Sequence, residues 1–183
     1  MIRKHDLFPD EIVLLVIDQQ EKLMAAMKDK EQVLRNTNLL LKLAELYKIP
    51  VVVTEQYPKG LGNTVPEIAE NLGEHTLIEK IVYSAFVPEM RRKLQELGRS
   101  KIVVVGTETH VCVYQTVRDL INEDFMVHVV KDAVCSRYLL NYENGLDLMK
   151  EVGAVVTNTE TVVFDVLKQA GTDEFKVMSK LVK

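Results

Sequence analysis

Short apolar runs alternate with longer segments of helical periodicity along the whole chain. The runs are rich in Val and Ile, mostly lack polar–apolar alternation, and cover residues 12–17, 49–54, 76–79, 102–105, 127–130 and 154–156. Uninterrupted apolar strands are what a parallel sheet covered on both faces requires. The pattern therefore predicts the six strands of a mainly parallel sheet.

Between these runs, apolar residues recur at spacings near 3.6 and predict amphipathic helices over residues 33–44, 90–97, 113–121, 146–152 and 162–167. Pro88 and Gly98 fit the first turn and the end of the second helix, and residues 64–67 resemble a capping box. Alternating strands and helices predict right-handed crossovers. We expect an α/β fold, a three-layer αβα sandwich of Rossmann-like type, in a single domain over residues 1–183.

Composition narrows the class of protein. The chain is 47% hydrophobic and 27% charged, which is typical of a globular protein, and its net charge of −4 supplies no basic field for nucleic acid. Residues 1–10 are polar and lack a signal peptide, and no apolar run is long enough to span a bilayer. Two cysteines fit free thiols in a reducing compartment. We expect a cytoplasmic protein with no nucleic-acid or membrane partner.

Three polar residues follow or end apolar runs, where open α/β sheets bind their ligands. Asp18 directly follows residues 13–17, although a helix N-cap is an equally good interpretation. Cys112 opens a helix, whose dipole favours thiolate and whose N–H groups suit an oxyanion; the alternative is a small buried hydrophobe, as we expect for Cys135. Lys80 is a cation that lowers the pKa of a nearby thiol, or else a surface lysine. Spacing alone does not bring the three together.

Four motifs resemble those of the isochorismatase-like hydrolase family. They are Val-Ile-Asp-Gln-Gln at residues 16–20, Lys-Ile-Val-Tyr-Ser-Ala-Phe at 80–86, Gly-Thr-Glu-Thr-His-Val-Cys-Val at 106–113 and Asp-Ala-Val-Cys-Ser-Arg at 132–137. Each motif is weak alone, but all four stand in the family's order at predicted strand ends. The similarity runs from about residue 12 to residue 167.

The resemblance implies a catalytic role for each of the three candidates. Cys112 corresponds to the nucleophile, Asp18 to the base that takes its proton, and Lys80 to the residue that orients Asp18 and stabilises thiolate. The family also places a cis peptide bond in the nucleophile loop, which falls at Thr107–Glu108 here. The N–H groups of Glu108 and Cys112 would then form the oxyanion hole.

The resemblance also bears on cofactors and substrate. Nicotinamidases of the family bind a divalent metal through Asp and His after the second strand, but residues 53–58 contain no His, so we expect no metal. Neither GxGxxG nor GxxxxGK occurs, so no nucleotide cofactor is indicated. Residues 55–62 resemble the isochorismatase domain-containing subgroup. We expect a cysteine hydrolase of a small amide or related carbonyl compound, acting on C–N bonds other than peptide bonds, with substrate-binding residues Gln20, Gln56, Tyr57 and Phe86.

Other functions stay open on the sequence alone. The chain is alternatively a non-catalytic binding or scaffold protein on the same fold, or a metal-dependent nicotinamidase-type amidase; a redox protein is disfavoured because no Cys-x-x-Cys occurs. A catalytic Cys112 predicts a thiol pKa well below that of a free cysteine. Apolar residues after Arg137 and in a capped helix from Thr172 fit either an interface or packing of that helix on its own domain, and the resemblance to a family of mostly oligomeric enzymes implies a homo-oligomer.

Overall fold

The computed structural model describes residues 4–183, so Met1, Ile2 and Arg3 of the polar N-terminal segment lie outside the described residues. A six-stranded, all-parallel sheet forms the centre, in the order β3-β2-β1-β4-β5-β6. The strands are β1 Ile12–Ile17, β2 Val51–Gln56, β3 His75–Lys80, β4 Lys101–Thr107, β5 Met126–Cys135 and β6 Val155–Thr157. This confirms the predicted fold class and all six strands.

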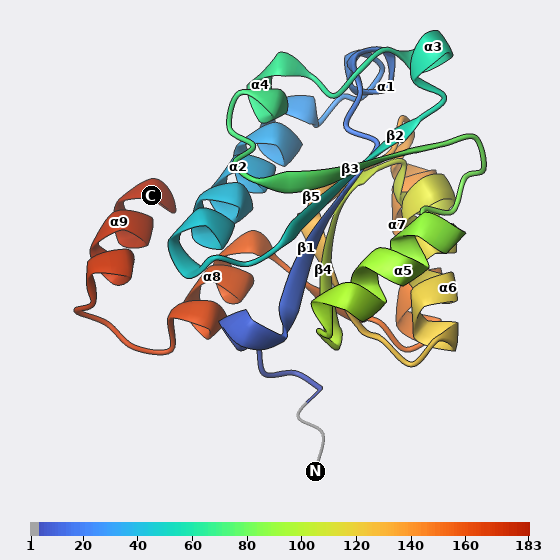
Figure 1. The fold of residues 1–183 in the computed structure, drawn as a ribbon. Coiled ribbons are helices and arrows are strands. Elements are labelled where there is room, and N and C mark those ends of the chain that lie inside the picture. The colour runs from blue at the N-terminus through green and yellow to red at the C-terminus, as the bar shows by residue number, and fades with distance from the viewer. Residues whose placement is uncertain (1–3) are drawn as a thin grey trace.

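Helices cover both faces of the sheet (Figure 1). One layer contains α2 Lys30–Tyr47, α8 Thr159–Leu167 and α9 Asp173–Leu181, and the other contains α5 Pro88–Leu97, α6 Tyr114–Asn122 and α7 Leu139–Glu151. The short helices α1 Glu21–Ala25, α3 Pro58–Leu61 and α4 Pro66–Ala69 lie toward the carboxyl ends of the strands (Figure 1). A 3-10 turn, η1 Pro9–Glu11, precedes β1, and a π-helical turn, η2 Thr109–Val113, joins β4 to α6.

The two helical layers enclose separate apolar cores because side chains alternate along each strand. On β1, Leu14 and Val16 pack toward α2 and α8, while Leu15 and Ile17 pack toward α5, α6 and α7. Every residue of β1 is buried, as the continuous apolar run predicts for a central strand. Strand β1 therefore fixes the point where its successor Asp18 leaves the sheet.

Element boundaries follow the local signals in most places and depart from them in one. Pro88 begins α5 and Gly98 ends it with a φ of 62°, as predicted. The capping box at residues 64–67 is wrong: α4 has Val65 as N-cap without a side-chain cap, and the Thr64 hydroxyl donates to Glu55 instead. A buried carboxylate at the end of β2 thus outcompetes the backbone N–H groups of a single helical turn.

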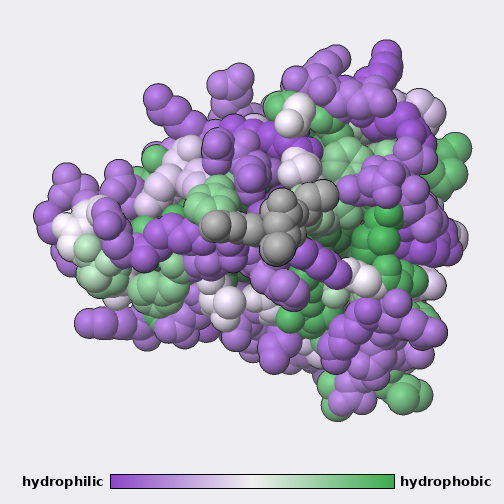
Figure 2. Space-filling model, turned by 90° about the horizontal axis from the view of Figure 1, so that it is seen from below, coloured by the Kyte–Doolittle hydropathy of each residue, from purple (hydrophilic) through white to green (hydrophobic). Residues whose placement is uncertain are grey.

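Polar side chains dominate the surface at the end of the molecule opposite α1, α3 and α4. The face at the amino ends of the strands is mostly hydrophilic, with hydrophobic patches between the polar side chains (Figure 2). No helix within residues 4–183 is long and apolar enough to cross a membrane.

Candidate active site

A buried ion pair joins the ends of two strands that are not neighbours in the sheet. Lys80 Nζ lies 2.6 Å from Asp18 Oδ2, and both side chains are fully excluded from solvent. The other carboxylate oxygen, Asp18 Oδ1, accepts a hydrogen bond of 2.7 Å from Thr54 Oγ1 on the intervening strand β2. Asp18 has a φ of 50°, which turns the chain sharply after β1. Asp18 is therefore no N-cap, since α1 begins only at Glu21.

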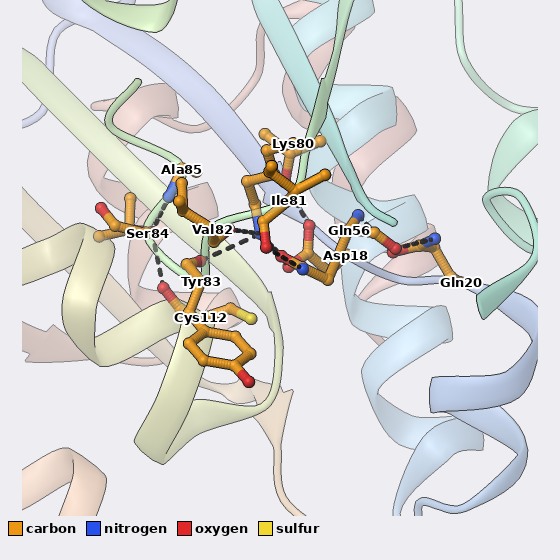
Figure 3. A network of polar contacts seen from close by, with 12 residues as sticks. Asp18, Gln20, Gln56, Lys80, Ile81, Val82, Tyr83, Ser84, Ala85 and Cys112 are labelled. Carbon is orange, nitrogen blue, oxygen red and sulfur yellow. Dashed lines mark hydrogen bonds and ion pairs between the residues drawn. The ribbon is translucent and has the colours of Figure 1, made fainter. Parts of the chain in front are cut away.

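Lys80 also organises the segment that follows β3. Its ammonium donates to Gln56 Oε1 at 2.8 Å, to the Tyr83 carbonyl at 3.0 Å and, more weakly, to the Val82 carbonyl at 3.3 Å (Figure 3). A buried ammonium needs such acceptors, because burial without partners costs several kcal/mol. Lys80 is thus a buried member of the site, and the interpretation as a surface lysine is wrong.

Cys112 lies in the π-helical turn η2 at the carboxyl end of β4, and only 5% of the residue is exposed. Gly106 allows this approach: it has a φ of 132°, and a Cβ there would lie 2.1 Å from the Ile17 carbonyl oxygen. Only glycine lets the end of β4 run this close to the end of β1. The thiol and Asp18 are therefore brought to the same edge of the sheet (Figure 3).

Neighbouring groups hold the turn that carries Cys112. The Val111 and Val113 N–H groups both donate to the Glu108 carbonyl, at 3.0 and 3.2 Å. Thr116 Oγ1 donates to the Cys112 carbonyl at 2.6 Å and accepts from the Ala85 N–H at 2.7 Å. The turn is thus fixed to its own helix and to the segment after Lys80.

The protonation state of the thiol differs from the sequence-based expectation. Burial and, next, the charge of Asp18 raise the pKa of Cys112 to about 12, although the charge of Lys80 lowers it. The prediction of a depressed pKa is therefore wrong, because desolvation and the Asp18 carboxylate outweigh the lysine and the helix terminus. The raised pKa favours the neutral thiol of Cys112 beside Asp18.

Glu108 connects the turn that carries Cys112 to the end of β5. The Thr107–Glu108 peptide bond is cis, at the position that the family resemblance implies. The nearly buried Glu108 carboxylate accepts from Arg137 N and from Arg137 Nε, both at 3.1 Å, just beyond the end of β5. The resemblance had included Arg137 in a motif without assigning it a partner, and the structure supplies Glu108.

The four residues predicted to bind substrate have unequal placements. The Gln20 amide exchanges hydrogen bonds with the backbone of Gln56 at 2.7 and 3.0 Å, on the far side of the network from Cys112 (Figure 3). The Gln56 amide accepts from Lys80 and donates to the Ile81 carbonyl at 2.9 Å. Both amides brace the ion pair. Their direct contact with substrate stays a prediction.

The two aromatic candidates differ in exposure. Tyr57 follows β2 in the left-handed region, with a φ of 39°, and is 54% exposed. Phe86 is half-buried, packs edge-on against Phe125 at 6.3 Å between ring centroids, and lies under the Arg91 guanidinium. Tyr57 is therefore free to meet a ligand, whereas one side of the Phe86 ring is already occupied.

Sequence reasoning missed two residues that support the site. Thr54 bonds Asp18, and Thr116 bonds the Cys112 carbonyl. The role of Thr54 depends on the register of β1 and β2, which places it beside Ile17, the residue before Asp18, and the sequence does not show this register. Thr116 stands four residues after Cys112, the spacing at which a threonine hydroxyl bonds back to the carbonyl of the preceding turn.

Metal ligands are scarce around this site. Among residues 4–183, no three His, Cys, Asp or Glu side chains are grouped so that they could hold a metal ion. The Asp18 carboxylate is already bonded to Lys80 and Thr54. The groups gathered at this site are one carboxylate, one ammonium and one thiol.

Sequence comparisons identify relatives over nearly the whole chain. The isochorismatase domain matches residues 13–161. The chain is 39% identical to the secreted isochorismatase effector Isc1 of Phytophthora sojae, over 97% of this chain and 87% of that protein. It is 36% identical to isochorismatase domain-containing protein 1 of Salmo salar, over 97% of this chain and 63% of that protein. The chain thus spans less than two thirds of the salmon protein.

Solved structures share the fold. One described as the MAR1 ribonuclease of Caenorhabditis elegans superposes with a TM-score of 0.92 at 34% identity, covering 97% of this chain and 92% of that chain. The YcaC gene product of Escherichia coli, described as an octameric hydrolase of unknown specificity, gives a TM-score of 0.90 at 21% identity, covering 99% and 92%. At that identity the second likeness concerns the fold alone.

Proposed function

The chain belongs to the isochorismatase family, and from this premise we propose that it is a hydrolase in which Cys112, Asp18 and Lys80 form a catalytic triad. It cleaves a small amide or related carbonyl compound through a covalent thioester. The observation that carries the proposal is the buried Lys80–Asp18 pair, whose carboxylate interacts electrostatically with the Cys112 thiol. A nucleophile within reach of a base that a third group orients is the arrangement that covalent catalysis requires.

Acylation begins from the neutral thiol. Asp18 takes the Cys112 proton as the sulfur attacks the carbonyl carbon, so no free thiolate needs to accumulate despite the raised pKa. The N–H groups of Glu108 and Cys112 hold the oxyanion. The protonated Asp18 then gives its proton to the leaving amine as the C–N bond breaks, which leaves the acyl group on sulfur.

Deacylation uses the same groups in reverse order. Asp18 takes a proton from a water molecule, and the oxygen of that water attacks the carbonyl carbon of the thioester. The second oxyanion collapses, the carboxylic acid leaves, and the sulfur recovers its proton from Asp18. Lys80 keeps its position throughout. Its positive charge stabilises the ionised Asp18 carboxylate each time Asp18 has given up its proton.

The surroundings of the site favour a small substrate that is largely uncharged. The residues beside Lys80 with the greatest apolar exposure are Ile81, Val82 and Tyr83, joined by Tyr57, whose N–H donates to the Lys80 carbonyl at 2.7 Å. The Arg137 guanidinium is engaged by Glu108. We therefore assign contacts with the substrate first to Tyr57. Gln20, Gln56 and Phe86 are further candidates.

A ribonuclease function, suggested by the name of the Caenorhabditis relative, fits less well. The net charge of −4 provides no extended basic field for a phosphate backbone. The site offers one buried lysine, whose acceptors are already in place. We keep RNA as a comparison substrate rather than as a proposal.

A substrate panel tests the reaction class. Purified enzyme is incubated with acetamide, benzamide, nicotinamide, N-carbamoylglycine and a short RNA, and ammonia or new RNA ends are measured. We expect ammonia from at least one amide, at the same rate after dialysis against EDTA, because the carboxylate is bonded to Lys80 and residues 53–58 contain no His. Turnover that appears only after a divalent metal is added would instead support the nicotinamidase-type reaction.

Assembly into a homo-oligomer is part of the proposal. Tyr138, Leu139 and Leu140 are all more than 60% exposed at the start of α7, and the Escherichia coli neighbour is described as octameric. In α9, Met178 is buried on α2 and α8, whereas Leu181 stays exposed. Burying such apolar groups in an interface of roughly 1,000 Å² or more would stabilise an assembly.

Light scattering at micromolar concentration measures the assembly directly. We expect a mass of at least twice 20.9 kDa. Leu139→Glu and Leu140→Glu should shift the mass downward, because each buries a charge in the interface, while Leu77→Glu on the edge strand β3 serves as the control. A fully active species of 20.9 kDa would remove the oligomer from the account.

Two free, buried thiols fit a reducing, cytoplasmic location, which we also propose.

A further inference from the structure

We propose that Arg137 is a positioning residue, which holds the Glu108 carboxylate and neutralises its charge beside the nucleophile. The inference rests on the proposed function, because it concerns the loop that would hold the oxyanion. Its physical content is separate: it predicts how two charges outside the triad set the reactivity of the Cys112 thiol.

Glu108 serves the loop through its backbone and its side chain at once. Its carbonyl accepts from Val111 and Val113, which closes the turn that carries Cys112. Its carboxylate is held from β5 by two hydrogen bonds of 3.1 Å, from the Arg137 N–H and from Arg137 Nε. The side chain of Glu108 therefore connects the position of this turn to the end of β5.

The charge of Glu108 is unfavourable for the chemistry unless it is compensated. Its side chain is only 9% exposed, and its charge adds to the causes that raise the pKa of Cys112. A carboxylate beside a developing oxyanion opposes that negative charge as well. The Arg137 guanidinium, 53% exposed, supplies the opposite charge while reaching solvent itself. The pair thus places a carboxylate anchor in the loop and cancels its electrostatic penalty.

A neighbouring contact provides a matched control. Ser136, directly before Arg137, is also bonded to the turn, with 3.0 Å between its Oγ and His110 Nδ1. Removing this contact loosens the same turn without exposing any charge. A purely structural role for residues 136–137 predicts similar effects from both positions, whereas charge compensation predicts an effect at Arg137 alone.

Alkylation of Cys112 by iodoacetamide reads the thiol without a known substrate. The rate is measured from pH 6 to pH 10 by mass mapping of the Cys112 peptide, in wild type, Arg137→Gln, Glu108→Gln, the double variant and Ser136→Ala. Arg137→Gln should alkylate about three- to tenfold more slowly at each pH, a shift of up to about one pKa unit. Glu108→Gln should react faster than wild type, and Ser136→Ala within about twofold of it.

The double variant decides between charge and structure. Removing the carboxylate from Arg137→Gln should restore alkylation to at least the wild-type rate, because no uncompensated charge is left. A double variant as slow as Arg137→Gln, or an Arg137→Gln enzyme with the wild-type profile, would overturn the proposal. If Arg137→Gln does not fold, Arg137→Lys should match wild type and Glu108→Gln should still exceed it; a Glu108→Gln enzyme no faster than wild type would then refute the inference.

The outcome is separable from the proposed function. Loss of the triad account would appear as turnover that survives Cys112→Ala, whereas loss of this inference alone would change the expected alkylation profiles and leave Cys112→Ala inactive. With a substrate from the panel, Arg137→Gln should lower kcat more than it raises KM, and Glu108→Gln in the same chain should recover part of kcat.

Discussion

Cys112→Ala is expected to abolish turnover, lowering the rate by roughly a thousandfold or more, because it removes the thiol that would carry the acyl intermediate. Cys112→Ser should be nearly as inactive, since a hydroxyl is a much poorer nucleophile without a stronger base than a carboxylate. Hydrolysis of the amide identified in the panel is the measurement. Both variants should stay folded, because the change is small and the turn is held by Glu108 and Thr116.

Cys135 supplies the matched control for this substitution. It is also buried, on β5, and its thiol contacts Thr107 Oγ1 rather than the triad. Cys135→Ala should cost a similar, small amount of stability and leave turnover within about a few-fold of wild type. Equal losses from the two substitutions would mean that Cys112 acts through packing and would refute its role as nucleophile.

Lys80→Met is expected to lower both stability and activity. The substitution leaves the Asp18 carboxylate buried without a cation, and breaking such a pair typically costs about 3–5 kcal/mol. It also removes the positive charge that lowers the pKa of Cys112, so the thiol should become still harder to ionise. Urea unfolding measures the first effect, and alkylation of Cys112 across pH measures the second.

Lys101 separates the two effects. It is also buried and ion-paired, with Glu11 at 2.7 Å, but it begins β4 at the opposite end of the sheet. Lys101→Met should therefore destabilise the protein without changing the alkylation profile of Cys112. If Lys80→Met and Lys101→Met gave the same profile, Lys80 would have only a structural role.

The fold was predictable because a parallel sheet has a strong sequence signature. Six apolar runs separated by helical periodicity leave few alternatives to a covered parallel sheet, and Pro88 and Gly98 marked the ends of α5 correctly. The capping box at Thr64 failed because its hydroxyl had a better acceptor, the Glu55 carboxylate. That acceptor comes from β2, nine residues earlier, and local pattern reasoning does not see such contacts.

The proximity of the three candidate residues was predictable from the sequence, but their electrostatics were predictable only in part. The resemblance tied Asp18, Lys80 and Cys112 together, and the structure brings all three to one sheet edge. The thiol pKa was predicted in the wrong direction, because a helix start and a lysine are visible in sequence but depth of burial is not. The Arg137–Glu108 pair was invisible for a similar reason, since it depends on where β5 ends relative to β4.

The most direct test of the account is a rapid-quench measurement of the Cys112 peptide during a single turnover with enzyme in excess. Samples are acidified at successive times, digested and weighed by mass spectrometry. The account predicts that the peptide gains the mass of the acyl group as the amine is released, and loses it again as the acid appears. If substrate were consumed and product formed with the Cys112 peptide unmodified at every time point, hydrolysis would not pass through a thioester and the proposed mechanism would be contradicted.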